Sequence, residues 1–152
     1  MSARGGCIFC DLTRFRAAEV CIENDHCLYA STRDPRDPPD VLPGGGVLIP
    51  VAHRSSPFDF TPEEWAATHE LLLQVKATWD ARLAPDGYLL AWNCGSPPGE
   101  PPIHAHLHVI PRFDDEPRAD AGARSAIKAP DNVRPDPAAP GNGRARAFGP
   151  AA

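Results

Sequence analysis

A regular apolar periodicity marks one long stretch of the chain, residues 61–83. Its apolar side chains recur at steps of seven, three, four and four residues, which places them on one face of a helix: Trp65, Leu72, Val75, Trp79 and Leu83. The start is also marked, because Thr61 can cap the helix, Pro62 suits its first turn and Glu64 completes a capping box. The sequence Pro85-Asp86-Gly87 ends the pattern, so one long helix is predicted before it.

Shorter apolar runs on either side of this helix predict strands. Residues 19–23 and 26–30 are typical of a hairpin with a polar turn between them. Residues 46–49 predict a short buried strand that ends at a proline, and residues 88–92 and 103–110 predict two more strands. Strands with one long helix crossing between them indicate an α+β domain.

Proline-rich segments divide the chain. Residues 130–152 carry five prolines and three glycines but a single aromatic residue, Phe148, which is too little apolar surface to offset the entropy of ordering. The sequence therefore predicts a folded domain over residues 1–129 and a disordered tail over residues 130–152. Residues 33–40 and 95–102 form two further proline clusters and are expected to be loops.

Composition narrows the class of protein. The 152 residues carry a formal net charge of −5, which does not favour a nucleic-acid partner. No apolar run approaches the roughly 18 residues of a membrane span. No apolar segment resembling a secretory signal follows the first residues, so we expect a cytoplasmic protein without a membrane partner. The five cysteines are odd in number and unevenly spaced, unlike a disulfide framework.

The strongest chemical signal is a row of histidines, His104, His106 and His108. On a strand, alternate side chains point to the same face, so the three imidazoles are expected to line up. Burying three polar rings together is costly without partners, which argues against a purely structural role. Two chemistries fit such a row: metal ligation by neutral imidazole, and nucleophilic attack on phosphorus by a ring whose other nitrogen holds its proton.

The row and its surroundings resemble the histidine-triad (HIT) superfamily. The matching pieces occur in order along the chain: Cys7-Ile8-Phe9-Cys10, Glu23-Asn24-Asp25, Leu48-Ile49-Pro50-x-x-His53, Asn93-x-Gly95, His104-x-His106-x-His108 and Val109-Ile110-Pro111-Arg112-Phe113. The triad with its Val-Ile-Pro-Arg continuation is the most specific of them. The resemblance implies an antiparallel sheet with one long helix, assembled as a homodimer.

The resemblance also implies nucleotide chemistry. Family members hydrolyse or transfer nucleotides at the α-phosphate, with dinucleoside polyphosphates and nucleoside phosphoramidates as substrate classes. By this resemblance His106 forms a nucleotidyl-histidine intermediate, the carbonyl of His104 orients its ring, and His108 contacts the phosphate. Asn93 helps to hold the nucleotide, and the backbone amide near Gly99 lies beside the phosphate.

One loop departs from the family pattern. Where the family has Gly-Gln-Ser/Thr-Val, this chain has Gly99-Glu100-Pro101-Pro102. Pro101 has neither a hydroxyl for the leaving group nor a backbone N–H, and Glu100 adds a negative charge near the phosphates. The acidic residue that usually holds the ribose is replaced by Thr32, with Asp34 as the nearest carboxylate. A nucleotide-binding interaction module with weak or no catalysis therefore remains as an alternative.

The pair Cys7 and Cys10 has the spacing of a zinc half-site. In a zinc-bearing branch of the family, the pair is completed by the residues that correspond to His53 and His104. A closed Cys2His2 set would be structural, since it leaves no open position on the metal. Two alternatives stay open. Cys7 and Cys10 are two buried free thiols, or the chain is a zinc-binding structural protein in which the triad serves only the metal.

Overall fold

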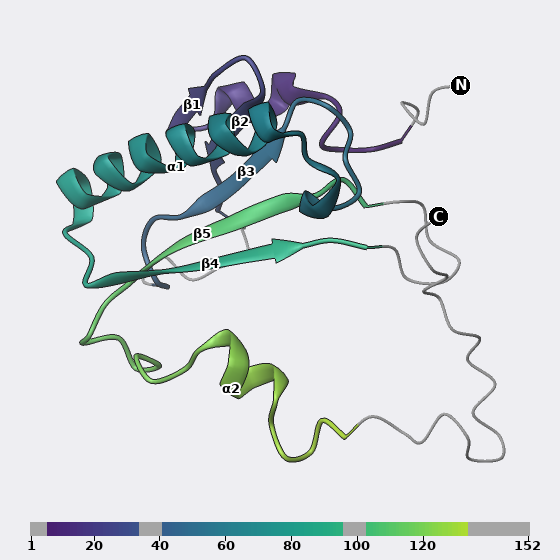
Figure 1. Cartoon of the computed structure of the whole chain (residues 1–152). Helices are drawn as coiled ribbons and strands as arrows, with labels where there is room; N and C mark the ends of the chain where they lie inside the picture. The colour runs from purple at the N-terminus through teal and green to yellow at the C-terminus, as the bar shows by residue number, and fades with distance from the viewer. Residues whose placement is uncertain (1–5, 34–40, 96–102, 134–152) are drawn as a thin grey trace, which may run out of the picture.

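The computed structural model describes residues 6–33, 41–95 and 103–133 (Figure 1). Gly99, Glu100, Pro101 and Asp34 lie outside these ranges, as does most of the predicted tail. Within them the chain forms helices and strands in this order: η1 (Leu12–Ala17), β1 (Cys21–Glu23), β2 (Cys27–Ser31), β3 (Gly46–Pro50), η2 (Pro57–Asp59), α1 (Pro62–Leu83), β4 (Gly87–Asn93), β5 (His106–Arg112) and α2 (Ala123–Ile127).

The strands form one five-stranded antiparallel sheet in the order β1-β2-β3-β5-β4. The predicted α+β architecture is confirmed. Strand β5 lies between β3 and β4, with Gly46 opposite Val109 and Asn93 opposite His106. The register therefore brings Asn93, at the end of β4, level with the first histidine of β5.

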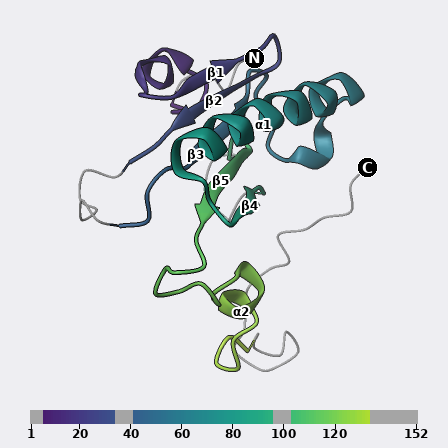
Figure 2. The ribbon, with the colours of Figure 1, turned by 90° about the vertical axis from the view of Figure 1, so that its left-hand side faces the viewer.

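Helix α1 covers one face of the sheet (Figures 1 and 2). Its predicted capping box is present: Thr61 Oγ1 accepts from the Glu64 amide at 3.2 Å, and a Glu64 carboxylate oxygen accepts from the Thr61 amide at 2.8 Å. The helix ends at Leu83, where Ala84 adopts a left-handed conformation with φ 46°. Among the described residues, no helix has both the length and the hydropathy that a bilayer crossing requires.

The buried stripe of α1 differs in part from the predicted one. It consists of Glu64, Ala67, Thr68, Leu71, Val75 and Trp79. The prediction is right for Val75 and Trp79 but wrong for Trp65, which is 44% exposed. Trp65 lies at the margin of the helix contact, where its ring packs against Phe60 and Trp92. The prediction followed the largest apolar residues, whereas the small Ala67 and Thr68 let the helix approach the sheet.

The two faces of the sheet carry different packing. On the α1 side, Leu107 and Val109 of β5 join a core with Tyr29 and Leu48. On the other side, Leu28, Ala30, Val47 and Ile49 pack with Leu12 of η1, and Phe9 and Phe15 lie against them. Because side chains alternate along a strand, His106 and His108 point to the η1 side. The candidate chemistry thus lies on the face opposite the long helix.

Candidate functional site

His104 stands just before β5 and is 1% exposed. Its Nε2–H donates to the Pro50 carbonyl at 2.8 Å, which fixes the tautomer and leaves the Nδ1 lone pair free. That Nδ1 lies 3.6 Å from Cys7 Sγ and 3.6 Å from Cys10 Sγ. Burial lowers the pKa of His104 despite the opposing effect of the Pro50 carbonyl, so the neutral ring is favoured.

Strand β5 begins later than predicted because of this arrangement. The sequence predicts a strand from Ile103, yet the Ala105 amide donates to the Arg54 carbonyl at 2.7 Å, outside the ladder. At its other end β5 continues through Pro111 to Arg112, paired with β4. His104 is thereby held by the chain that follows β3.

Three distant parts of the chain bring together Cys7, Cys10, His53 and His104. One ligand atom from each of the four lies within 4.8 Å of all the others. The two cysteines sit on a turn closed by the Cys10 amide and the Cys7 carbonyl at 3.2 Å. His53 follows β3, and its Nδ1 lies 3.1 Å from Cys10 Sγ. These four residues form a Cys2His2 cluster that can bind a metal ion.

The dimensions of the cluster suit a tetrahedral ion. With Zn–S bonds of about 2.3 Å and Zn–N bonds of about 2.1 Å, a sulfur and a nitrogen on one tetrahedron are about 3.6 Å apart. Both sulfur–nitrogen distances to His104 have this value, and the Cys10–His53 distance is 3.1 Å. The bond from His104 Nε2 to a backbone carbonyl is the outer contact that metal-bound histidines commonly make.

His106 is oriented by the same stretch of backbone. Its Nδ1–H donates to the His104 carbonyl at 3.0 Å, so in the neutral ring Nε2 carries the lone pair. The residue is 8% exposed. Nε2 lies 3.4 Å from the Asn93 amide nitrogen, on the side of the ring that faces the end of β4. The arrangement provides an imidazole that needs no base to act as a nucleophile.

His108 and Asn93 complete the polar surface beside His106. The Asn93 amide donates to His108 Nε2 at 3.0 Å, and the rings of His106 and His108 meet edge to face with centroids 5.0 Å apart. Burial first, and then His106, lowers the pKa of His108. The predicted residues His104, His106, His108 and Asn93 are therefore all gathered here. The three histidines fall into two groups: the His104 ring faces the cysteines, whereas His106 and His108 lie beside Asn93.

Phe9 is a site residue that the sequence analysis did not single out. Its ring stacks on the His106 ring with centroids 4.6 Å apart and planes 25° apart. It also meets His104 edge-on at 6.1 Å and stacks with Phe15 at 5.4 Å. The position of an aromatic residue between two cysteines is the one sequence signal for Phe9. The sequence does not indicate that its ring contacts the His106 ring.

The segment after β3 connects the site to the start of α1. The Gly95 amide donates to the Ser55 carbonyl at 3.2 Å, which fixes the end of β4 beside His53. Arg54 makes a bidentate pair with Glu64, with Nη2 3.0 Å and Nε 3.1 Å from the same oxygen. Burial opposes ionisation of Glu64, but Arg54 and the Thr61 amide lower its pKa overall. The helix cap thus also anchors the site.

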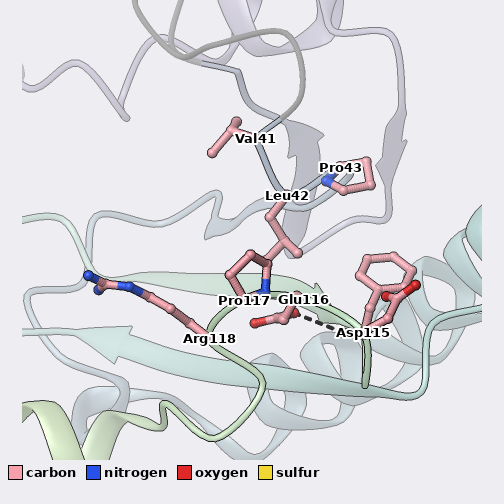
Figure 3. A pocket seen from close by; sticks show the side chains of 8 residues that line it. Val41, Leu42, Pro43, Asp115, Glu116, Pro117 and Arg118 are labelled. Atoms are coloured by element: carbon pink, nitrogen blue, oxygen red, sulfur yellow. Dashed lines mark hydrogen bonds between the residues drawn. The ribbon is translucent and has the colours of Figure 1, made fainter.

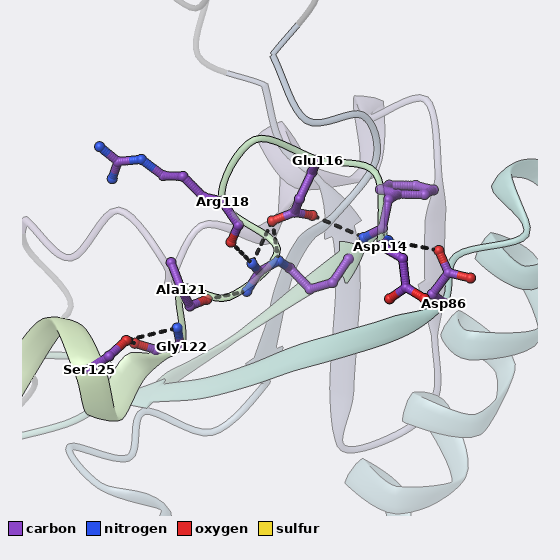
Figure 4. A network of polar contacts seen from close by, with 9 residues as sticks. Asp86, Asp114, Glu116, Arg118, Ala121, Gly122 and Ser125 are labelled. Atoms are coloured by element: carbon purple, nitrogen blue, oxygen red, sulfur yellow. Dashed lines mark hydrogen bonds and ion pairs between the residues drawn. The ribbon is translucent and has the colours of Figure 1, made fainter.

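The Arg112 guanidinium is held by the turn that follows β5. Its Nε donates to Glu116 at 2.7 Å, Nη1 to the Ala121 carbonyl at 2.8 Å and Nη2 to the Arg118 carbonyl at 2.7 Å (Figure 4). The other Glu116 oxygen accepts from the Phe113 amide at 2.9 Å. The guanidinium therefore orders the turn after β5. The position of Arg112 next to the triad in the sequence did not indicate this structural role.

A cavity of about 580 Å³ opens beside His108. It runs past Ile110 and Thr32 to the glycine-containing segment before β3. Thr32, predicted to stand where the family holds a ribose, is exposed and lines this cavity. Another cavity of about 580 Å³ lies between Val41–Pro43 and the turn of residues 113–118 (Figure 3). It contains none of the candidate site residues.

Two curated relatives share most of this chain's length. An uncharacterized HIT-like protein from Methanocaldococcus jannaschii is 29% identical over 113 residues, which are 72% of this chain and 81% of that protein. An uncharacterized HIT-like protein from Mycoplasma genitalium is 28% identical over 109 residues, 71% of this chain and 74% of that protein. No family model matches the chain.

Solved structures agree with the sequence relatives. A HIT family protein from Bacillus anthracis superposes with a TM-score of 0.57 at 28% identity, over 78% of this chain and 80% of that one. A HIT family member from Bacillus subtilis shares the fold with a TM-score of 0.54 at 21% identity, over 81% of this chain and 91% of that one. In sequence, fold and metal-ligand cluster, the chain therefore resembles the histidine-triad superfamily and its zinc-bearing branch.

Proposed function

We propose that the chain is a nucleotide hydrolase or nucleotidyl transferase that acts at an α-phosphate through a nucleotidyl-histidine intermediate on His106. Dinucleoside polyphosphates and nucleoside phosphoramidates are the substrate classes. The observation that carries the proposal is the 3.0 Å bond from His106 Nδ1–H to the His104 carbonyl. It keeps the proton on Nδ1 and presents the Nε2 lone pair beside two further polar side chains, Asn93 and His108.

Two displacements make up the reaction. In the first, the Nε2 lone pair attacks the α-phosphorus, a nitrogen–phosphorus bond forms, and the bond from phosphorus to the leaving group breaks. The leaving group keeps that bonding pair and takes up a proton from water. In the second, water attacks the phosphorus, the nitrogen–phosphorus bond returns its pair to Nε2, and a proton is released. In a transferase, another hydroxyl or amine takes the place of the water.

The neighbours of His106 have distinct tasks in this scheme. The imidazole becomes positively charged once Nε2 is bonded to phosphorus, and the His104 carbonyl stabilises that charge through Nδ1–H. The Asn93 amide donates a hydrogen bond to the bound nucleotide, and His108 contacts the phosphate oxygens. The backbone amide of Gly99 and the side chain of Glu100 belong to the nucleotide-binding loop of this proposal.

We assign zinc as the structural cofactor, held by Cys7, Cys10, His53 and His104. All four ligands, two thiols and two imidazoles, are of types suited to zinc, and the two sulfur–nitrogen distances to His104 match a tetrahedral site. A closed Cys2His2 set leaves no coordination position for substrate, so zinc bound there supplies folding free energy and no reacting group.

The proposal extends to assembly: the chain forms a homodimer. Support for the dimer comes from β4, which pairs with β5 on one side and ends the sheet on the other among the described residues. A seven-residue strand at a sheet edge offers backbone groups for pairing with a second copy.

Mass spectrometry of the intact protein tests the proposal. After brief exposure to an activated adenylate, wild type should gain the mass of one adenylyl group, and peptide mapping should place it on His106. The His106→Ala variant is the control and should gain none. Nucleotide binding without a covalent label would favour the binding module, in line with Glu100 and Pro101 in the departing loop.

A further inference from the structure

We propose that Phe9 is a positioning residue for His106, holding the plane of the imidazole so that Nε2 points at the substrate. The inference rests on the proposed function, because it assigns His106 as the nucleophile. Phe9 belongs to the turn that also carries Cys7 and Cys10, whereas His106 begins β5. The contact therefore joins the metal-binding turn to the reacting ring.

The geometry is that of a stacked pair. The ring centroids of Phe9 and His106 are 4.6 Å apart, and the planes differ by 25°. This separation lies at the short end of the range that aromatic pairs adopt. Phe15 of η1 stacks with Phe9 in turn, at 5.4 Å and 14°, so Phe9 is itself supported from a second element. His106 is 8% exposed, so little of the residue is open to solvent.

A stacked ring supplies a constraint that the hydrogen bond of His106 does not. The bond from Nδ1–H to the His104 carbonyl restrains the torsion of the imidazole only loosely, because a hydrogen bond tolerates angular deviations of about 30°, so the ring can still turn by that amount. The lone pair of Nε2 lies in the ring plane, so such a turn swings it away from an in-line approach to phosphorus. Flat contact with Phe9 defines the plane. Positioning errors of about 1 Å can cost about 100-fold in rate, so control of the plane bears on kcat.

The same turn explains how the metal cluster can influence the reaction without touching substrate. Phe9 lies one residue from Cys10 and two from Cys7, and the Cys10 amide bonds back to the Cys7 carbonyl at 3.2 Å. Metal ligation by both thiols would fix this backbone on either side of the aromatic ring. The cluster would then influence the placement of His106 through two contacts, one with the His104 carbonyl and one with the Phe9 ring.

Steady-state kinetics with adenosine 5′-phosphoramidate, on the full zinc-loaded chain, test the role. Phe9→Leu keeps apolar bulk but removes the flat ring, and it should lower kcat about tenfold while KM stays within about twofold. Phe9→Tyr restores the ring and should recover kcat to within about threefold of wild type. Ile8→Ala changes the neighbouring residue, which is 56% exposed, and should leave both constants unchanged. Zinc content should match wild type in all three.

Other results would overturn the inference. An undiminished kcat in Phe9→Leu, a rise in KM alone, or an equal loss in Phe9→Tyr would each do so. NMR of the wild type gives a check that does not depend on how any variant folds. Cross-peaks should join Phe9 ring protons to the His106 ring protons, and their absence would refute the contact. Failure of the proposed function gives a different result, namely a wild type that neither turns over the phosphoramidate nor carries nucleotide on His106.

Discussion

His104 uses two different groups to serve two neighbours: its ring Nδ1 lies 3.6 Å from each cysteine sulfur, and its backbone carbonyl accepts the Nδ1–H of His106 at 3.0 Å. One residue thus belongs to the metal cluster through its side chain and to the candidate nucleophile through its backbone. Any movement that loosens the cluster also moves the acceptor that sets the His106 tautomer. The cluster and the reaction should therefore be linked in function while remaining separable by mutation.

Replacement of the nucleophile is the first prediction. His106→Ala should lower turnover at least about 1,000-fold, because no other described side chain can supply a nucleophile from the same position. Steady-state rates on a nucleoside phosphoramidate and a dinucleoside polyphosphate measure the loss. A variant that retains more than about a tenth of wild-type turnover would contradict a covalent mechanism on this residue. His108→Ala should also slow the chemical step.

Loss of a metal ligand is the second prediction. Metal analysis should find about one zinc per chain, and Cys7→Ser should lower both zinc content and Tm because the metal's folding free energy is partly forfeited. Turnover should fall as well, through the placement of His106. The matched control is His106→Ala, whose zinc content should be unchanged. The ligand assignment is wrong if His106→Ala loses the metal while Cys7→Ser keeps it.

Local sequence signals predicted much of the fold. The capping box of Thr61 and Glu64 depends on residues three apart, and it is present with both hydrogen bonds. The Asn24-Asp25 turn likewise joins β1 and β2 as expected. Such features depend on neighbours along the chain, which the sequence displays directly. The start of β5 was misplaced because Ala105 bonds to Arg54, a partner about fifty residues away.

Contacts between distant segments account for what the sequence did not predict at the site. The stack of Phe9 on His106 joins residues 97 positions apart, and no periodicity encodes it. Arg112 follows the triad directly, yet its guanidinium turns to Glu116 and two carbonyls. Strand alternation alone predicted that His106 and His108 share a face, whereas the partner of each ring depends on how loops fold over the sheet.

A third prediction concerns pH and His108. Because burial and His106 lower its pKa below the ordinary 6.5, the unfolded chain binds this proton at a higher pH than the folded chain does. The stability contribution is complete above about pH 6.5 and is lost as pH falls from there toward the native pKa. Chemical denaturation should show a steeper loss of unfolding free energy in wild type than in His108→Gln between about pH 7 and about pH 5. Parallel profiles would contradict this.

A fourth prediction separates a structural Arg112 from a phosphate-binding one. Lysine lacks the planar fork that reaches Glu116 and two carbonyls together, so Arg112→Lys should loosen the turn after β5. Hydrogen exchange should become faster at amides of residues 113–122, including Phe113, whose amide donates to Glu116. Turnover should stay within about threefold of wild type. A loss of about 100-fold with exchange unchanged would instead place the guanidinium at the substrate.

The last prediction concerns assembly. Among the described residues, strand β4 lies at one edge of the sheet, and its Leu90 is 48% exposed. Trp65, near the start of α1, is 44% exposed. Pairing of two such edges across a twofold axis would cover these side chains and satisfy the free backbone groups. Analytical ultracentrifugation at micromolar protein should give twice the chain mass of 16.3 kDa.

Charge at the edge should weaken that dimer. Leu90→Lys places a cation on β4, where like charges would meet across the twofold axis, and it should shift the sedimenting species toward the monomer. Phe58→Lys adds the same charge at a residue of η2 that is 90% exposed, and it should leave the mass unchanged. A wild-type mass near 16 kDa would reject the dimer. Equal dissociation by both variants would place the interface elsewhere, because the effect would then not depend on the β4 edge.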